Sequence, residues 1–292
     1  MYHSILSVLF LGMIPVVSQP VLQQQILDIS VAPPAPLISV SERLSASGIV
    51  IMDVKSGQQL YGRQPTVRRP MASITKLMTA LIIAENHELD ELVTISPDVQ
   101  DVEGNIVHLP PGEQFTVGDL LSALLISSAN DAAYALATYH SATEASFIFD
   151  MNIRATSLGL KGTSFANASG LDHPRQWSTP KDIAWLTMFA LRHTEIRERM
   201  GVSDKMIYSK KGVSVSLSHT HAMLHASTSV VGGKTGTTDA AGQCLVSVVE
   251  QDDREYVVVL LNSLQRYKDM KSILATIAPT PAVISAADSP ET

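Results

Sequence analysis

Residues 70–85 read PMASITKLMTALIIAE and place a serine and a lysine three positions apart at the head of an almost wholly apolar run. Apolar side chains recur after Ser73 at the spacing of one helix face, beginning with Ile74 and Leu77, and this pattern predicts a helix packed into a core. Residues i and i+3 of a helix share a face, so the amine of Lys76 is expected close to the serine hydroxyl. Two interpretations follow, a catalytic pair or a helix cap followed by a stray charge.

Strands are expected at both ends of the folded chain, with helices between them. GIVIMDV (48–54) and QLYGRQ (59–64) flank a KSGQ turn and predict a hairpin, and residues 242–263 read as two β-branched runs joined by a charged turn. Helices are expected over 116–127, 130–140, 180–193 and about 266–277. Because no βαβ alternation is present, the order predicts an α+β fold, with an antiparallel sheet flanked by helices plus an all-helical half.

The composition is that of a globular protein, with 45% hydrophobic and 17% charged residues among 292. A net charge of -7 and the lack of a basic stripe exclude nucleic acid as the partner. The single cysteine, Cys244, excludes an internal disulfide framework and cysteine-based metal or haem sites. We expect this residue to be a small buried side chain.

The N-terminal sequence is typical of an exported protein. An apolar run over 5–17 is shorter than the roughly 20 residues of a membrane span and fits a signal peptide. We expect a signal peptide over 1–18 and export to the periplasm or another extracytoplasmic part of the envelope, with an uncleaved anchor or a buried segment as alternatives. A linker over 19–40 then precedes a folded domain over 41–278, and a disordered tail follows over 279–292.

The serine–lysine spacing is not informative by itself, because Ser178 and Lys181 repeat it in STPK. That second pair lies in a polar helix entry, where capping residues are expected. The apolar surroundings of Lys76 differ, since a desolvated lysine has a lowered pKa and can take the proton of a neighbouring serine. A capping serine with a snorkelling lysine is the alternative for the first pair.

Two further elements follow in order along the chain. Ser128-Ala129-Asn130 falls between two apolar helices, where a loop can present a hydroxyl and an amide to a cleft, although simple helix capping is the alternative. Lys234-Thr235-Gly236 lies on an expected strand, whose glycines allow a ligand to approach the backbone. A second such tripeptide, Lys55-Ser56-Gly57, precedes Ser73 and reads as an ordinary hairpin turn.

The ordered set S-x-x-K, S-x-N and K-T-G resembles the motifs of the penicillin-recognising serine D,D-peptidases. The resemblance is greatest to the low-molecular-mass D-alanyl-D-alanine carboxypeptidases and endopeptidases of the peptidase S11 family, and it runs from about residue 47 to residue 274. It implies a β-lactamase/transpeptidase-like fold and a D,D-peptidase catalytic domain over 41–278. It also implies an enzyme without a cofactor.

The resemblance further implies a role for each motif residue. Ser73 is expected to be the nucleophile that forms an acyl-enzyme, Lys76 the base that takes its proton, and Ser128 the proton relay to the leaving amine. Asn130 is expected to bond the substrate amide and the lysine. The residues expected to bind the substrate carboxylate are Lys234, Thr235 and Thr237. The backbone N–H groups of Ser73 and Thr237 would form the oxyanion hole. The two lysines should also disfavour each other's charge.

The implied activity is that of a serine-type D-Ala-D-Ala carboxypeptidase acting on peptidoglycan stem peptides. The alternatives are a D,D-endopeptidase that cleaves peptidoglycan cross-links and a catalytically silent module that binds the cell wall. β-Lactams are expected to be covalent inhibitors, because residues 165–172 (FANASGLD) contain no glutamate to activate a deacylating water. The protein is expected to be a monomer, peripheral to the cell envelope and without a C-terminal membrane anchor.

Two histidines of a group of three depart from the family pattern. Alternation along a strand would place His219 and His221 on one face, and His225 follows them. The alternatives for this group are a metal site, a pH-sensitive lining of the cleft and ordinary polar strand residues, and we predict no metal. Arg266 is a further candidate for the substrate carboxylate and is left outside the predicted site.

Overall fold

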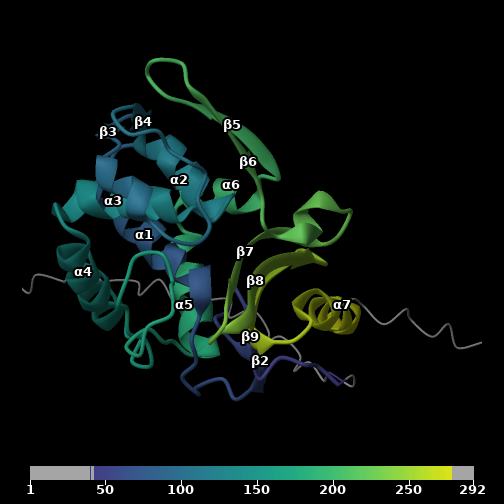
Figure 1. Cartoon of the computed structure of the whole chain (residues 1–292). Coiled ribbons are helices and arrows are strands. Elements are labelled where there is room, and N and C mark those ends of the chain that lie inside the picture. Colours follow the sequence, from purple (N-terminus) through teal and green to yellow (C-terminus); the bar gives the residue numbers. More distant parts are fainter. Residues whose placement is uncertain (1–39, 41–42, 278–292) are drawn as a thin grey trace, which may run out of the picture. The chain divides into compact units, whose positions relative to one another are not determined.

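The computed structural model describes Val40 and residues 43–277. The expected signal peptide (1–18), the expected linker up to residue 39 and the expected tail (279–292) lie outside these residues. The elements are, in chain order, β1 (Gly48–Asp53), β2 (Gln59–Arg63), η1 (Ala72–Thr75), α1 (Lys76–Asn86), β3 (Leu92–Thr94), η2 (Pro97–Asp101), β4 (Gln114–Thr116), α2 (Val117–Leu125), α3 (Asn130–Ser141), α4 (Glu144–Ser157), α5 (Pro180–Ala190), α6 (Thr194–Gly201), β5 (Asp204–Tyr208), β6 (Ser214–Ser218), η3 (Ala222–His225), β7 (Val230–Thr238), β8 (Gly242–Gln251), β9 (Arg254–Ser263) and α7 (Arg266–Ile277), where η marks a 3-10 turn (Figure 1).

An antiparallel sheet of five strands has the order β2-β1-β9-β8-β7. Both hairpins predicted from the sequence are present, since β1 pairs with β2 and β8 pairs with β9. Asp252 and Asp253 join β8 to β9 with φ angles of 51° and 57°, the conformation that a two-residue hairpin turn requires. Because β1 also pairs with β9, the helical half is inserted between strands of one sheet.

Side chains of the sheet alternate between two cores on its opposite faces. On β1, Val50 and Met52 belong to the larger core, which is shared with the helical half, whereas Ile49 and Ile51 belong to a smaller core. Met270 of α7 packs into the smaller core. Both faces are therefore covered, which explains why the strands read as continuous apolar runs.

The helix α1 lies at the centre of the helical half and contacts each of α2 to α6. Every residue from Lys76 to Ile83 is buried, as the apolar run predicts. Close packing on all sides restricts how far such a helix can shift. The start of α1 is therefore a rigid platform for the residues that it carries.

The chain enters α1 through the 3-10 turn η1. The prediction that Ser73 and Lys76 share one α-helix is wrong in one respect, because Ser73 lies in η1 and α1 begins at Lys76. Ala72, with a φ of 49°, precedes the serine in this turn. Side chains at i and i+3 eclipse one another in a 3-10 turn, so the pair is still brought together.

Two of the predicted helices begin at threonine caps. The hydroxyl groups of Thr116 and Thr179 accept hydrogen bonds from the backbone N–H groups three residues later, each at 3.0 Å, and so cap α2 and α5. The elements α4 and α6 and the short hairpins β3–β4 and β5–β6 were not predicted. Among the described residues, no helix has the length and apolar character needed to cross a membrane.

Candidate active site

Ser73 and Lys76 are in direct contact at the junction of η1 and α1. The Lys76 Nζ lies 3.0 Å from the Ser73 Oγ, and the lysine side chain is fully buried. Thr75 donates its hydroxyl to the carbonyl of Ala72 at 2.9 Å and accepts a hydrogen bond from the Gln176 amide at 2.9 Å. These bonds hold the turn that presents the serine.

The amine of Lys76 has three oxygen neighbours. Besides the serine, its Nζ lies 2.6 Å from Asn130 Oδ1 and 2.7 Å from the carbonyl oxygen of Ser169. Burial lowers the pKa of Lys76 to about 7, while the Asp131 carboxylate acts in the opposite direction. Above this pH the amine is neutral. It can then donate two hydrogen bonds and accept one from the Ser73 hydroxyl.

The side-chain amide of Asn130 has a fixed orientation. Its Nδ2 donates to the carbonyl of Glu103 at 2.7 Å, so its Oδ1 faces Lys76. Gly104 has a φ of 86°, and a Cβ at this position would lie 2.6 Å from the Asn130 Nδ2. The N-cap of α3 is Ala129, without a side-chain hydrogen bond, so simple capping does not account for this motif.

Ser128 contacts Lys234, the lysine of the third motif. The Lys234 Nζ lies 2.6 Å from the Ser128 Oγ, and the lysine side chain is fully buried. Burial first, and then the charges of Lys76 and Arg266, hold the pKa of Lys234 well below its usual value. The expected repulsion between the two lysines therefore lowers the pKa of Lys234. The pKa of Lys76 is lowered by burial instead. Ser128 has a φ of 60°, an uncommon conformation that persists where the surroundings enforce it.

The third motif lies on a strand, β7, as predicted, and this strand forms one edge of the sheet. Lys234 and Thr235 are buried on this strand, while Thr237 is exposed. A Cβ on Gly236 would lie 2.8 Å from the backbone nitrogen of Ser73. The glycine therefore permits the close approach of β7 to the turn that carries the serine.

Arg266 and a backbone carbonyl belong to this cluster although neither was in the predicted site. The guanidinium Nη1 of Arg266 donates to the carbonyl of Gly236 and to the Thr237 Oγ1, each at 2.9 Å. The sequence offers only one weak signal for this contact, an arginine at the start of the last predicted helix. The Ser169 carbonyl that contacts Lys76 is a backbone group, so the residue type at this position does not indicate the contact.

The prediction that His219 and His221 share a strand face is wrong. The strand β6 ends at Ser218, and His221 is the N-cap of η3, where its Nδ1 accepts a hydrogen bond from the backbone N–H of Met223. Because the chain leaves the strand before His219, the alternation of a strand does not apply. Within residues 43–277 and Val40, no three His, Cys, Asp or Glu side chains are grouped so that they could hold a metal ion.

Both of the first two histidines are buried and neutral near pH 7. Burial, followed by the charge of Lys234, lowers the pKa of His219 to about 3, and burial, followed by Arg266, lowers that of His221 to about 4. The His221 Nδ1 is an acceptor, so its Nε2 carries the proton and donates to the Ser247 Oγ at 2.8 Å. These values favour neutral polar packing over a pH-sensitive lining.

Cys244 is buried on β8, as predicted. Burial raises the pKa of its thiol to about 11, and its Sγ lies 3.7 Å from the carbonyl of Ala241. A thiol with this pKa and no exposure is not a candidate nucleophile.

Known proteins resemble this chain over most of its length. A family model described as D-alanyl-D-alanine carboxypeptidase, Peptidase S11, matches residues 34–265. The D-alanyl-D-alanine carboxypeptidase DacF of Bacillus subtilis (strain 168) is 30% identical over 75% of this chain and 57% of the relative, so this chain spans little more than half the length of that protein. The D-alanyl-D-alanine endopeptidase of Pseudomonas aeruginosa is 27% identical over 80% of this chain and 77% of the relative.

A solved structure shows the same arrangement of elements. The D-alanyl-D-alanine carboxypeptidase from Mycobacterium tuberculosis H37Rv matches with a TM-score of 0.78 and 27% identity, over 85% of this chain and 97% of that chain. This similarity confirms the predicted α+β fold of the β-lactamase/transpeptidase type. The chain belongs to the peptidase S11 family, the D-alanyl-D-alanine carboxypeptidases.

Proposed function

We propose that this protein is a serine-type D-Ala-D-Ala carboxypeptidase that acts on peptidoglycan stem peptides through an acyl-enzyme on Ser73. The observation that carries the proposal is the 3.0 Å contact between the serine Oγ and the fully buried amine of Lys76, whose pKa is about 7. A neutral amine at this distance can accept the hydroxyl proton as the oxygen attacks a carbonyl carbon. Family membership supports the substrate class, and we assign the catalytic domain to residues 41–278.

In the proposed acylation step, the Ser73 Oγ bonds to the carbonyl carbon between two D-alanines and its proton passes to the Lys76 Nζ. The backbone N–H groups of Ser73 and Thr237 are the proposed oxyanion donors, each worth roughly 3–4 kcal/mol in comparable sites. The C–N bond breaks as the leaving amine receives a proton through Ser128, whose hydroxyl contacts Lys234. Water then hydrolyses the ester and regenerates the serine.

The same residues provide sites for the charged end of the substrate. Lys234, Thr235 and Thr237 are the proposed ligands of the terminal carboxylate. Arg266 adds a positive charge 2.9 Å from the Thr237 hydroxyl, so it favours an anion at this position. Asn130 positions Lys76 through its Oδ1 and keeps its second N–H for the substrate amide.

Cleavage of D,D cross-links is the second candidate, supported by the similarity to an endopeptidase. It uses the same acyl transfer, but the leaving amine belongs to a second stem peptide. A silent wall-binding module would keep the scaffold without turnover. The contacts of Ser73, Lys76 and Asn130 described above favour an enzyme.

A mass-spectrometric assay of peptidoglycan fragments tests the proposal. Incubation with wild-type protein should remove one D-alanine from uncross-linked pentapeptide fragments, and Ser73→Ala should remove none. Conversion of cross-linked dimers to monomers without release of D-alanine would identify an endopeptidase instead. Penicillin labelling without hydrolysis of any fragment would favour the silent module.

We further propose that β-lactams inhibit the protein as slowly hydrolysed acyl-enzymes, since the 165–172 loop has no glutamate to activate water. We also propose that the protein is exported to the cell envelope, which its membership of a family of D-alanyl-D-alanine carboxypeptidases supports, and that it is a monomer at the periphery of the envelope. Detection of the protein in the envelope fraction, and its mass in solution, would test these two points.

A further inference from the structure

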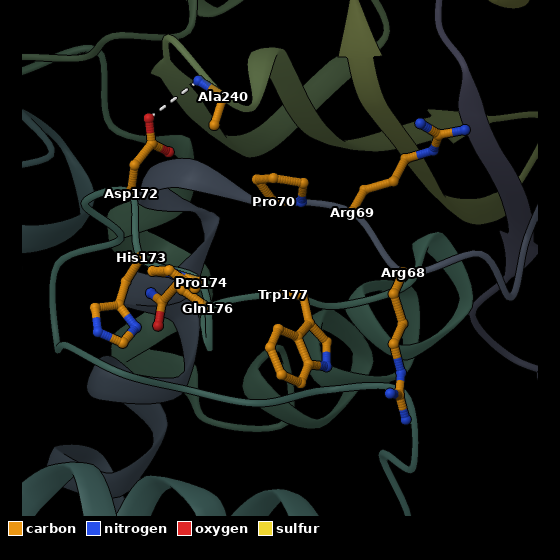
Figure 2. Close-up of a pocket in the computed structure, with 9 residues that line it drawn as sticks. All are labelled: Arg68, Arg69, Pro70, Asp172, His173, Pro174, Gln176, Trp177 and Ala240. Atoms are coloured by element: carbon orange, nitrogen blue, oxygen red, sulfur yellow. Dashed lines mark hydrogen bonds between the residues drawn. The ribbon is translucent and has the colours of Figure 1, made fainter.

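A pocket of about 610 Å³ lies beside the segment that leads to Ser73 and contains none of the predicted site residues (Figure 2). It is formed between this segment and the 172–177 loop. We call it the Arg-Trp pocket. Its lining includes Arg68, Pro70, Asp172, Pro174, Trp177 and Ala240.

The Arg-Trp pocket lies at one end of β7. Asp172 ties the loop to this end, because its carboxylate accepts hydrogen bonds from the Thr238 hydroxyl at 2.6 Å and from the Ala240 N–H at 3.0 Å, the second of which is drawn in Figure 2. The residues proposed to bind the carboxylate of the leaving D-alanine, Lys234, Thr235 and Thr237, all come before Thr238 on the strand. A substrate bound in this way directs its acyl half toward the pocket.

The pocket is within reach of a peptide held at the nucleophile. Pro70 precedes Ser73 by three residues, so the two are at most about 11 Å apart. An extended peptide advances about 3.3 Å per residue. A group in the pocket would therefore belong to a residue about two to four positions from the scissile bond.

The walls of the pocket are apolar, and one rim is cationic. Pro70, Pro174 and Trp177 supply the apolar surface. The guanidinium of Arg68 lies over the Trp177 ring, with its Cζ 5.7 Å from the ring centroid. The Nη2 of Arg68 donates a long hydrogen bond, 3.4 Å, to the carbonyl of Lys161. A planar donor group is thus held at the rim of an apolar cavity.

The cationic rim is not neutralised by the protein. Neither Arg68 nor Arg69 forms an ion pair with any residue that the structure describes. The Arg69 Nε is buried without a hydrogen-bond partner. Asp172 is already engaged by β7. Since the chain has 28 acidic and 21 basic residues, unpaired arginines at a cavity run against its overall charge and favour an anionic ligand.

A second cleft near the serine has the opposite charge. It has a volume of about 420 Å³, adjoins Asn130, and is lined by four acidic side chains, Asp98, Asp101, Glu103 and Glu144. These would repel a carboxylate. Of the two cavities, the Arg-Trp pocket is the one that suits an anion.

We propose that the Arg-Trp pocket binds a substrate residue on the acyl side of the scissile bond whose side chain has an aliphatic stem and ends in a carboxylate. The stem packs on Pro70, Pro174 and Trp177, and the carboxylate pairs with the guanidinium of Arg68. This inference deepens the proposed function and rests on it for the direction of the substrate. It makes Arg68 a specificity residue, not a catalytic one.

The test compares two synthetic peptides that end in D-Ala-D-Ala. They differ only in a side-chain carboxylate or the matching carboxamide, placed two to four residues before the scissile bond. We expect wild-type kcat/KM to favour the carboxylate peptide about tenfold, the ratio that corresponds to about 1.4 kcal/mol. Arg68→Gln should reduce this preference to about onefold, because it removes the guanidinium that pairs with the carboxylate. The Arg68 side chain is exposed, so the substitution should not disturb the core.

Arg192→Gln is the matched control, since Arg192 also stacks on an aromatic ring, 5.1 Å from the centroid of Phe189, away from the pocket. It should keep the tenfold preference. All three proteins should hydrolyse N-acetyl-D-Ala-D-Ala equally, because this peptide has no group for the pocket. A wild-type preference near onefold, or a preference that survives in Arg68→Gln, would overturn the inference.

Calorimetric titration of the same two peptides separates failure of this inference from failure of the proposed function. If no protein hydrolyses any peptide, the proposed function fails. The carboxylate peptide should still bind wild-type protein about tenfold more tightly than the carboxamide, and Arg68→Gln should abolish that difference. Equal binding of the two peptides to wild-type protein would overturn the inference in this case as well.

Discussion

The pairs Ser73–Lys76 and Ser178–Lys181 share one spacing but have opposite surroundings. Lys76 is fully buried with its amine 3.0 Å from the serine hydroxyl. Lys181 is exposed, and the Ser178 hydroxyl pairs instead with that of Thr163 at 2.8 Å. The comparison shows that burial of the amine and its contact with the hydroxyl make a reactive pair, whereas the spacing does not.

The two K-[ST]-G tripeptides show the same difference. Lys234 is buried on β7 and contacts Ser128. Lys55 is exposed in a hairpin turn, where the neighbouring Ser56 donates its hydroxyl to Asp53 at 2.8 Å. Only the tripeptide on the edge strand takes part in the cluster around the first pair.

The largest effect on turnover is expected from removal of the buried amine. Lys76→Met should lower kcat/KM for D-alanine release by roughly 10³-fold, because general-base catalysis contributes roughly 10²–10⁴. Lys181→Met should leave kcat/KM within about twofold, since the side chain is exposed. A continuous assay of released D-alanine measures both.

Thermal unfolding serves as the control for Lys76→Met, because the substitution is made in a close-packed core. A variant that remains folded and keeps wild-type activity would break the distinction between the two pairs.

The pH dependence of acylation should distinguish the buried lysine from the exposed one. Lys76 must be neutral to accept a proton, and its pKa is about 7, so the rate constant should rise with pH through 7 and then level off. At pH 6 it should be about tenfold below the plateau, because about one tenth of the amine is then neutral. Stopped-flow measurement with a chromogenic β-lactam gives the profile.

Lys181→Met should leave the inflection of this profile unchanged. An inflection near pH 10, the range of an ordinary lysine, would show that Lys76 is not desolvated in the working enzyme.

A further contrast concerns the two glycines of the K-[ST]-G tripeptides. Gly236→Ala would place a Cβ 2.8 Å from the Ser73 backbone nitrogen, and we expect roughly 10²-fold slower acylation from displacement of the serine. Gly57→Ala introduces a side chain at a φ of 69° and would place its Cβ 2.9 Å from the Trp185 ring, so it should cost at least about 1–2 kcal/mol of unfolding free energy without slowing acylation. Urea denaturation and acylation rates, measured on both variants, distinguish the two outcomes.

The sequence predicted the parts of the fold that depend on local patterns. The β8–β9 hairpin and α7 were found where β-branched runs and helix signals placed them. The helix α4 was missed although Phe147, Met151 and Ala155 recur at a helical spacing and are its buried residues. Its exposed side carries polar and large apolar side chains together, so no clean amphipathic pattern stands out.

The site was predictable only where a side chain carries the signal. The motif residues Ser73, Lys76 and Lys234 were predicted, and the structure brings them into one cluster. The Ser169 carbonyl could not be predicted, because any residue type has one. Contacts such as that of Arg266 with Thr237 depend on the packing of α7 against β8 and β9, which no local pattern encodes.

The central claim is that Ser73, and not the equally spaced Ser178, is the nucleophile. Wild-type protein, Ser73→Ala and Ser178→Ala are incubated with a penicillin, digested and mapped by mass spectrometry. We predict that the mass of the penicillin is added to the peptide containing Ser73 in wild-type protein and in Ser178→Ala, and to no peptide in Ser73→Ala. Labelling that persists in Ser73→Ala, or that maps to the peptide containing Ser178, would contradict the account.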